Sequence, residues 1–181
     1  FFTDWNGDMT AGGGKPVVIQ HCPDYTHFNY NTIHKGVGGT CNNCYGMIMS
    51  ASTALLSQPP VVGLEVIGNT FVGMKRAIEL GEPDNPVRIG GIKILHNTGY
   101  SVTNFFSIID EVSNAEIRNN LNYLGNVVYC EATGAIISST ISNNGWFGSS
   151  SDQGSCSGSC ASVCSASDTK GSNPLFTNPS V

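Results

Sequence analysis

The stretch GLEVIGNTF (Gly63 to Phe71) returns as GIKILHNTGY (Gly91 to Tyr100) and, more faintly, as NAEIRNNLNY (Asn114 to Tyr123). Each copy contains an asparagine at the same place, and a fourth copy closes in ISNNGWF (Ile141 to Phe147). The repeat length is 28, 23 and 24 residues when it is counted between these asparagines, which are Asn69, Asn97, Asn120 and Asn144. Repeats of this length are typical of solenoids, in which each unit buries its apolar face against the next.

Each copy predicts at least two short strands, because its apolar residues alternate with polar ones. Three and five positions before each asparagine stand Val66 and Leu64, Ile94 and Ile92, Ile117 and Ala115, and Ile141 and Ser139. A second apolar run follows about nine residues later, as RAIEL (76–80), FFSII (105–109) and VVYC (127–130). The L-x-x-L-x-L frame of leucine-rich repeats is absent, so we predict a β-helix of about five coils, with HFNYNTIHKG (27–36) as an earlier, degenerate copy.

The repeated asparagines are expected to form a structural ladder. An asparagine at one corner of every coil can take the left-handed backbone of a sharp bend, and its amide can bond to the amides above and below. Asn69, Asn97, Asn120 and Asn144 are therefore predicted to stabilise the stack rather than to bind a ligand.

The strand–Asn–turn units, the ISNNGWF segment and NPLFTNP (173–179) resemble the right-handed parallel β-helix superfamily of pectate-lyase-like proteins, over roughly residues 60–180. The resemblance implies a right-handed parallel β-helix. Many members of this superfamily are polysaccharide lyases or hydrolases, while others are adhesins, tailspikes or matrix proteins, so the resemblance concerns the fold more than the activity.

The amino-acid composition limits the kinds of molecule that this protein is expected to bind. The eight Lys and Arg residues are scattered and the net charge is −5, so the sequence has no basic stripe for nucleic acid. It also has no apolar run long enough for a membrane span. We expect self-association end to end, or contact with neighbouring domains, and glycans as further partners.

Seven cysteines favour an oxidising compartment and a secreted or cell-surface protein. Zinc is the alternative for the CNNC segment (41–44), although no second pair of ligands follows it; free thiols are another. The odd number leaves at least one thiol unpaired or bonded to another chain. The disulfide candidates are Cys22, Cys41, Cys44, Cys130, Cys156, Cys160 and Cys164.

No catalytic group is identified, and the candidates come from the resemblance. Lyases of the superfamily use an Arg or Lys as base and often calcium held by carboxylates. Lys75 and Arg76 are candidates for the first role, and Glu82 and Asp110 for the second or for flanking a glycosidic bond. The repeated asparagines serve as anchors from which positions in each copy are counted. By this count Arg76 should stack with Asn104 and Val127, and Glu79 with Ser107 and Cys130. No group of acidic side chains that could hold calcium therefore surrounds Lys75 and Arg76.

An aromatic residue follows each anchor by two or three positions, in Phe71, Tyr100, Tyr123 and Trp146. We predict that these residues form one row along the stack. Buried, the row would be core packing; exposed, it would be a platform for the flat faces of sugars.

Three regions are expected: an aromatic and Gly-rich leader at 1–15, β-helix coils at 16–148 with a loop excursion at 36–60, and a Ser/Gly/Cys-rich cap or arm at 149–181. The sequence favours a non-catalytic extracellular module, structural or carbohydrate-associated, as a candidate subunit of a surface filament. No cofactor is expected for such a module. The alternatives are a polysaccharide lyase or glycoside hydrolase acting on acidic glycans, with calcium as its cofactor, and a glycan-binding adhesin.

Overall fold

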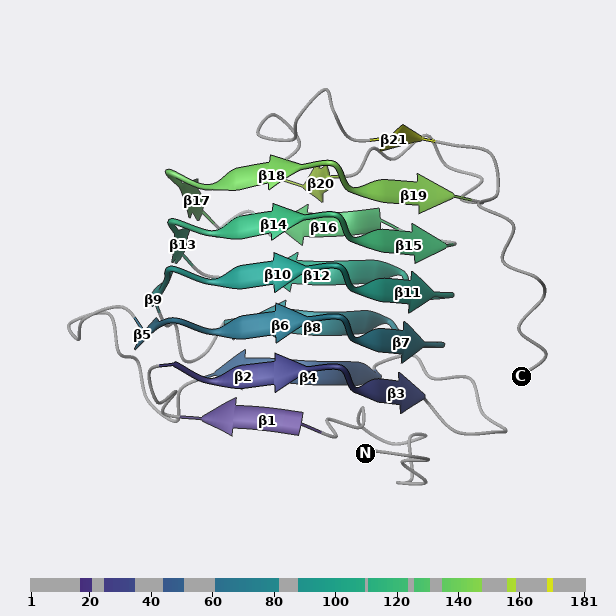
Figure 1. Ribbon diagram of the computed structural model, residues 1–181, viewed down its shortest axis with the longest axis horizontal. Helices are drawn as coiled ribbons and strands as arrows, with labels where there is room; N and C mark the ends of the chain where they lie inside the picture. Colours follow the sequence, from purple (N-terminus) through teal and green to yellow (C-terminus); the bar gives the residue numbers. More distant parts are fainter. Residues whose placement is uncertain are drawn as a thin grey trace.

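The computed structural model describes residues 17–20, 25–34, 44–50, 61–81, 88–109, 111–123, 126–130, 135–147, 156–158 and 169–170. These residues form strands, turns and bends and contain no helix. The strands make four parallel sheets, and within each sheet neighbouring strands follow one another in the order of the sequence (Figure 1). The prediction of an all-β chain with parallel strands is confirmed, and the arrangement is consistent with a β-solenoid.

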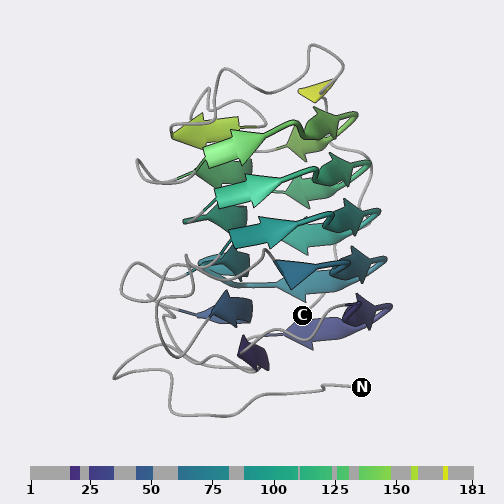
Figure 2. The ribbon, with the colours of Figure 1, turned by 90° about the vertical axis from the view of Figure 1, so that its left-hand side faces the viewer.

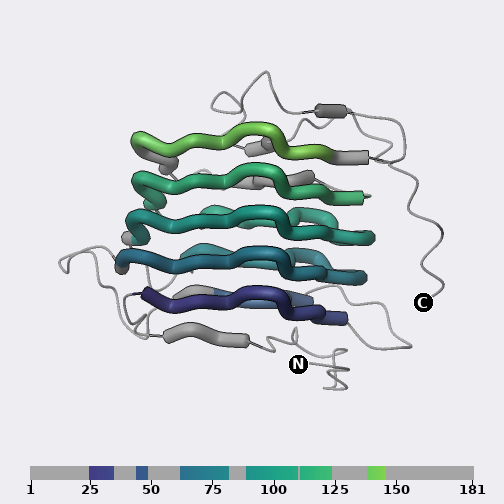
Figure 3. The backbone as a smooth tube through the Cα atoms, in the orientation of Figure 1, coloured from purple at the N-terminus to yellow at the C-terminus, as the bar shows by residue number. Residues whose placement is uncertain are grey.

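Two of the sheets, B and C, are formed by consecutive short strands before and after the repeated asparagine. The backbone tube shows the successive turns of the chain lying one above another (Figure 3). Sheet B has the order β18-β14-β10-β6-β2, with β2 (His27–Asn29), β6 (Glu65–Ile67), β10 (Lys93–Leu95), β14 (Glu116–Arg118) and β18 (Thr140–Ser142). Sheet C has the order β21-β19-β15-β11-β7-β3, with β3 (Thr32–His34), β7 (Thr70–Val72), β11 (Thr98–Tyr100), β15 (Leu121–Tyr123), β19 (Gly145–Phe147) and β21 (Thr169–Lys170).

The other two sheets, A and D, complete the turns of the chain (Figure 2). Sheet A has the order β1-β4-β8-β12-β16-β20, with β1 (Val17–Gln20), β4 (Tyr45–Ser50), β8 (Arg76–Leu80), β12 (Asn104–Ile108), β16 (Asn126–Cys130) and β20 (Cys156–Gly158). Sheet D has the order β17-β13-β9-β5, with β5 (Val61–Val62), β9 (Arg88–Gly90), β13 (Glu111–Ser113) and β17 (Ala135–Ile137). A complete repeat thus holds four strands, two more than the minimum expected from sequence.

Apolar side chains stack inside the coils because each strand repeats the same inward position. In sheet B the inward residue is the middle one of each three-residue strand, and the paired residues are all buried: Phe28, Val66, Ile94, Ile117 and Ile141. Burying apolar surface against the next coil is what a single repeat cannot do alone.

The corners of the coils use left-handed backbone in rows. The residue before each anchor asparagine has positive φ, in Tyr30, Gly68, His96, Asn119 and Asn143. The expectation that the anchors themselves adopt this conformation is wrong, because the anchor turns its amide inward while its predecessor makes the bend. A second row of residues with positive φ lies just before the strands of sheet B and consists of Tyr25, Gly63, Gly91, Asn114 and Ser138.

Candidate functional site: the polar rows of sheets A and B

A ladder of buried asparagines joins the coils at the corner between sheets B and C. The Nδ2 group of Asn69 donates to Oδ1 of Asn97 at 3.0 Å, Asn97 to Asn120 at 2.9 Å, and Asn120 to Asn144 at 3.0 Å. Asn31, which lies in the degenerate first copy, extends the ladder by donating to Oδ1 of Asn69 at 3.1 Å. Each inner amide also donates to a backbone carbonyl of the preceding coil, so its hydrogen-bonding groups are taken up within the stack.

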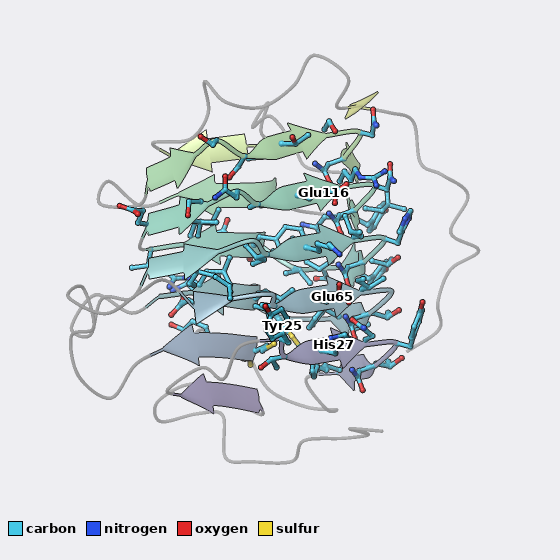
Figure 4. All side chains as sticks on the ribbon, turned by 60° about the vertical axis from the view of Figure 1, so that its left-hand side comes forward. Tyr25, His27, Glu65 and Glu116 are labelled. Atoms are coloured by element: carbon cyan, nitrogen blue, oxygen red, sulfur yellow. The ribbon has the colours of Figure 1, made fainter. Side chains whose placement is uncertain are left out.

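The outer face of sheet B carries a row of polar residues, one per coil, four of which are ionisable. His27, Glu65, Lys93, Glu116 and Thr140 are paired in register. Figure 4 shows His27, Glu65 and Glu116 one above another on this face. Nζ of Lys93 lies 3.0 Å from Oε1 of Glu65, and Nδ1 of His27 lies 3.4 Å from Oε2 of the same carboxylate.

The hydrogen bond and charge of Lys93 hold the pKa of Glu65 below its ordinary value of 4.5, against a smaller opposing effect of burial; the charge of His27 also lowers the pKa. Because this pKa is lower in the folded chain, the Glu65–Lys93 pair contributes stability above pH 4.5 and loses it as the pH falls through the lowered pKa.

Lys93→Gln is therefore expected to lower the free energy of unfolding by less than about 1 kcal/mol at neutral pH, because the pair is solvent-exposed. The difference from the unsubstituted chain should shrink at acidic pH, once the pH has fallen through the lowered pKa of Glu65 and its carboxyl group is protonated. Urea unfolding at neutral and at acidic pH measures this, with Thr140→Ala in the same row as the control. A difference that persists at low pH would assign the effect of Lys93 to packing instead.

Strand β8 of sheet A holds a second ion pair, which is largely buried. Arg76 bonds to the carboxylate of Glu79, and the two side chains are 16% and 5% exposed. The Cζ atom of Arg76 also lies 5.6 Å from the ring centroid of Tyr45, its register partner on the neighbouring strand, within the range of a cation–π contact. Lys75 is half-buried beside this pair, and its backbone N–H donates to the carbonyl of Cys44 at 3.1 Å.

The expected vertical neighbours of this pair are partly wrong. Arg76 pairs with Asn104, which pairs with Asn126 and not with Val127. Glu79 pairs with Ser107, which pairs with Tyr129 and not with Cys130. The reason is that Tyr123 and Asn126 are one residue closer in the chain than Tyr100 and Asn104, so β16 in the copy of Asn120 is shifted by one position relative to its anchor.

The structure also divides the predicted aromatic row. Phe71 is buried and packs edge-on against Phe105 at 5.7 Å, and its register partner is Gly99 rather than Tyr100. Tyr100 and Tyr123 are paired on the outer face of sheet C and stack in parallel at 5.2 Å. Trp146 pairs with Asn122, in the row of Phe71. The prediction that the four aromatic residues form one row is therefore wrong, because Phe71 lies at an inward position and Tyr100 at an outward one. The rings of Tyr100 and Tyr123 also cover each other's faces, so those faces are not open to a sugar.

The interior row of Phe71 continues with Gly99 and then with a polar residue, Asn122, which the sequence did not indicate. Asn122 is buried and donates to the carbonyl of Val102 at 2.8 Å. Its amide occupies the space that a Cβ at Gly99 would need, since that atom would lie 2.4 Å from Oδ1 of Asn122. The pairing of a glycine with an asparagine 23 residues later is the signal that could have revealed this contact.

Several predicted site residues lie outside the described residues. These are Glu82 and Asp110, the calcium candidates, together with Cys22, Cys41, Cys160 and Cys164. Cys44 is buried and disulfide-bonded, while Cys130 and Cys156 are described only as strand positions. Within the described part of the chain, no three His, Cys, Asp or Glu residues are placed to hold a metal ion, and no helix is long and apolar enough to cross a bilayer.

Comparison of the chain with protein-family models, with curated proteins and with solved structures finds no match.

Two glycines at the left-handed corners have aromatic rings in the place of a Cβ. A Cβ at Gly68 would lie 2.7 Å from both Cδ1 and Cε1 of Tyr30, and a Cβ at Gly63 would lie 2.7 Å from Cδ1 of Tyr25. The same corners hold His96 and Asn119 in later coils. Positive φ alone therefore does not require glycine at these corners. Glycine is required at Gly63 and Gly68 because a tyrosine ring occupies the space of the Cβ atom.

Gly68→Ala is expected to destabilise the chain by roughly 2–3 kcal/mol, about half from left-handed alanine and the rest from displacing the Tyr30 ring. Gly91→Ala is the matched control, since it has a similar φ but its Cβ would meet only the backbone nitrogen of Gly63, at 3.8 Å. Chemical denaturation of both variants, alone and with Tyr30→Ala, measures the difference. Equal losses in the two alanine variants would contradict the ring contact.

Proposed function

We propose that this chain is a secreted, non-catalytic module built as a right-handed parallel β-helix of about five coils, similar to the pectate-lyase-like superfamily. Its role is structural or carbohydrate-associated, at a cell surface or in an extracellular assembly. The disulfide at Cys44 supports an oxidising compartment. The described strands support assembly, because the end strands of sheet B, β2 and β18, each pair with one neighbour in that sheet, and such edges can accept further strands.

The observation that carries the non-catalytic part is the engagement of Arg76. Its guanidinium is bonded to a buried carboxylate and lies near the ring of Tyr45. The carboxylate of Glu79 favours the charged guanidinium, and a charged guanidinium has no site to accept a proton. An arginine held in this way suits a structural role better than that of the base in a lyase reaction.

The test is incubation of the protein with polygalacturonate, alginate and hyaluronan, with and without calcium, while absorbance from new carbon–carbon double bonds is followed. We expect no increase above that of a heat-unfolded sample. A signal that is lost in Lys75→Ala and Arg76→Ala would replace the proposal with a polysaccharide lyase. Reducing-end assays on the same samples detect hydrolysis, and light scattering with electron microscopy shows whether copies polymerise.

A further inference from the structure

The exposed large hydrophobic side chains among the described residues belong to one coil. Tyr25 is 74% exposed and Tyr30 is 80% exposed. They stand at the two ends of β2, one at each corner of sheet B, and Tyr25 lies next to His27 (Figure 4). Tyr25 and Tyr30 are the exposed large hydrophobic residues of the part of the chain whose burial is described, and rings exposed in this way are a feature of a binding surface.

Both tyrosines adopt backbone conformations that bulky residues rarely take. The φ angles are 60° at Tyr25 and 58° at Tyr30, where Asn, Asp or Gly is the usual residue. The next coil has Gly63 and Gly68 at the same corners, and each leaves room for a ring. Strain of this kind persists only where the surroundings enforce it, and the two tyrosine–glycine contacts hold the rings in place at some cost in stability.

Polar groups lie between the rings. The side chain of His27 is 59% exposed and reaches the carboxylate of Glu65 in the next coil. Asn29 is half-buried, with its Oδ1 accepting the backbone N–H of Ile67 at 2.9 Å. The five residue steps from Tyr25 to Tyr30 span at most about 17 Å, at about 3.3 Å per residue of extended chain. The surface is thus two aromatic rings separated by a strip of hydrogen-bonding side chains.

We propose that Tyr25, Tyr30 and the strip formed by His27 and Glu65 bind a neutral, hexopyranose-based glycan chain that runs along β2. The two rings would stack on the C–H faces of separate sugar units, and the imidazole and carboxylate would bond to the hydroxyl groups between them. Uronate polymers are disfavoured, because the strip contains Glu65 and the chain carries a net charge of −5. This inference rests on the proposed carbohydrate-associated role and names its site.

The experiment is isothermal titration of the full chain with cellohexaose, mannohexaose and hexa-N-acetylchitohexaose, with oligogalacturonate as the acidic comparison. At least one neutral oligosaccharide is expected to bind, and oligogalacturonate to bind more weakly. Tyr25→Ala and Tyr30→Ala should each weaken binding by roughly tenfold or more, as for other aromatic anchors. Tyr25→Phe and Tyr30→Phe keep the rings and should retain most of the affinity. His96→Ala, which stands at the corner of Tyr30 two coils further along, should leave binding unchanged.

The other possible results each reject either the glycan site or the proposed function. Binding that survives both alanine substitutions, in variants whose melting curves show them folded, removes this site but leaves a carbohydrate-associated module. Absence of binding to every oligosaccharide also removes the site. If the alanine variants instead lose self-association in light scattering, the rings form a protein interface and the glycan site is rejected. Cleavage of an oligosaccharide would contradict the non-catalytic function itself, whatever the tyrosine variants do.

Discussion

Asn97→Ala is expected to lower the free energy of unfolding by about 4 kcal/mol. Asn97 takes part in four side-chain hydrogen bonds: it accepts from the backbone N–H and the Nδ2 group of Asn69, and it donates to the carbonyl of Val66 and to Oδ1 of Asn120. The residue is 1% exposed, so water cannot replace these partners without opening the stack. Each buried polar group left without a partner costs about 1–3 kcal/mol, and Asn69 and Val66 would lose theirs.

Asn31→Ala is the matched control, because it makes the same substitution at the end of the same ladder. Oδ1 of Asn69 would still accept the backbone N–H of residue 31, which lies 2.8 Å away, so the loss should stay near 1 kcal/mol. Guanidinium unfolding monitored by circular dichroism measures both. A typical domain is stable by roughly 5–15 kcal/mol, so the Asn97 variant should lose about a quarter to four-fifths of that stability. Equal losses at Asn97 and Asn31 would mean that the ladder contributes no more inside the stack than at its edge.

Arg76→Met is expected to cost about 3–5 kcal/mol, the usual loss when one partner of a buried ion pair is removed. The carboxylate of Glu79 would remain in a site where its side chain is 5% exposed. Desolvation of an uncompensated charge, rather than the loss of an attraction, causes most of this effect.

The double variant Arg76→Met/Glu79→Leu separates these two contributions. Replacing both members of a buried pair with apolar residues of similar volume is often neutral, so the double variant should be more stable than Arg76→Met by about 2 kcal/mol or more. Denaturant unfolding of Arg76→Met, Glu79→Leu and the double variant completes a double-mutant cycle. The exposed Glu65–Lys93 pair provides a comparison, since its interaction energy is expected to stay below about 1 kcal/mol. Additive effects at the two positions would contradict a coupled pair.

Strands and stacking could be predicted from sequence because both depend on local alternation and on a recurring residue. The strands at Glu65–Ile67, Lys93–Leu95 and Glu116–Arg118 lie where the alternation before Asn69, Asn97 and Asn120 placed them. The charged row of sheet B also follows from the spacing, since Glu65, Lys93 and Glu116 stand at one offset from the anchors.

Rows beyond a corner could not be predicted in the same way, because corners differ in length by one residue. A single residue fewer between Tyr123 and Asn126 moves the partners of Arg76 and Glu79. Phe71 follows Asn69 by two residues, whereas Tyr100 follows Asn97 by three. Because side chains alternate between the two faces of a strand, this difference of one residue places Phe71 inward and Tyr100 outward.

The amino-acid sequence by itself determined that this chain repeats, that its repeats are strands, and that an asparagine recurs in them, because a period of two and a spacing of 23 to 28 residues are written in residue order. Only the tertiary structure decided which residue before each asparagine bends the chain, that Arg76 and Glu79 are buried together, and that Tyr25 and Tyr30 rest on glycines of the next coil. These features depend on which atoms meet between coils. Burial, hydrogen bonding and backbone strain are set by such contacts and not by position along the chain.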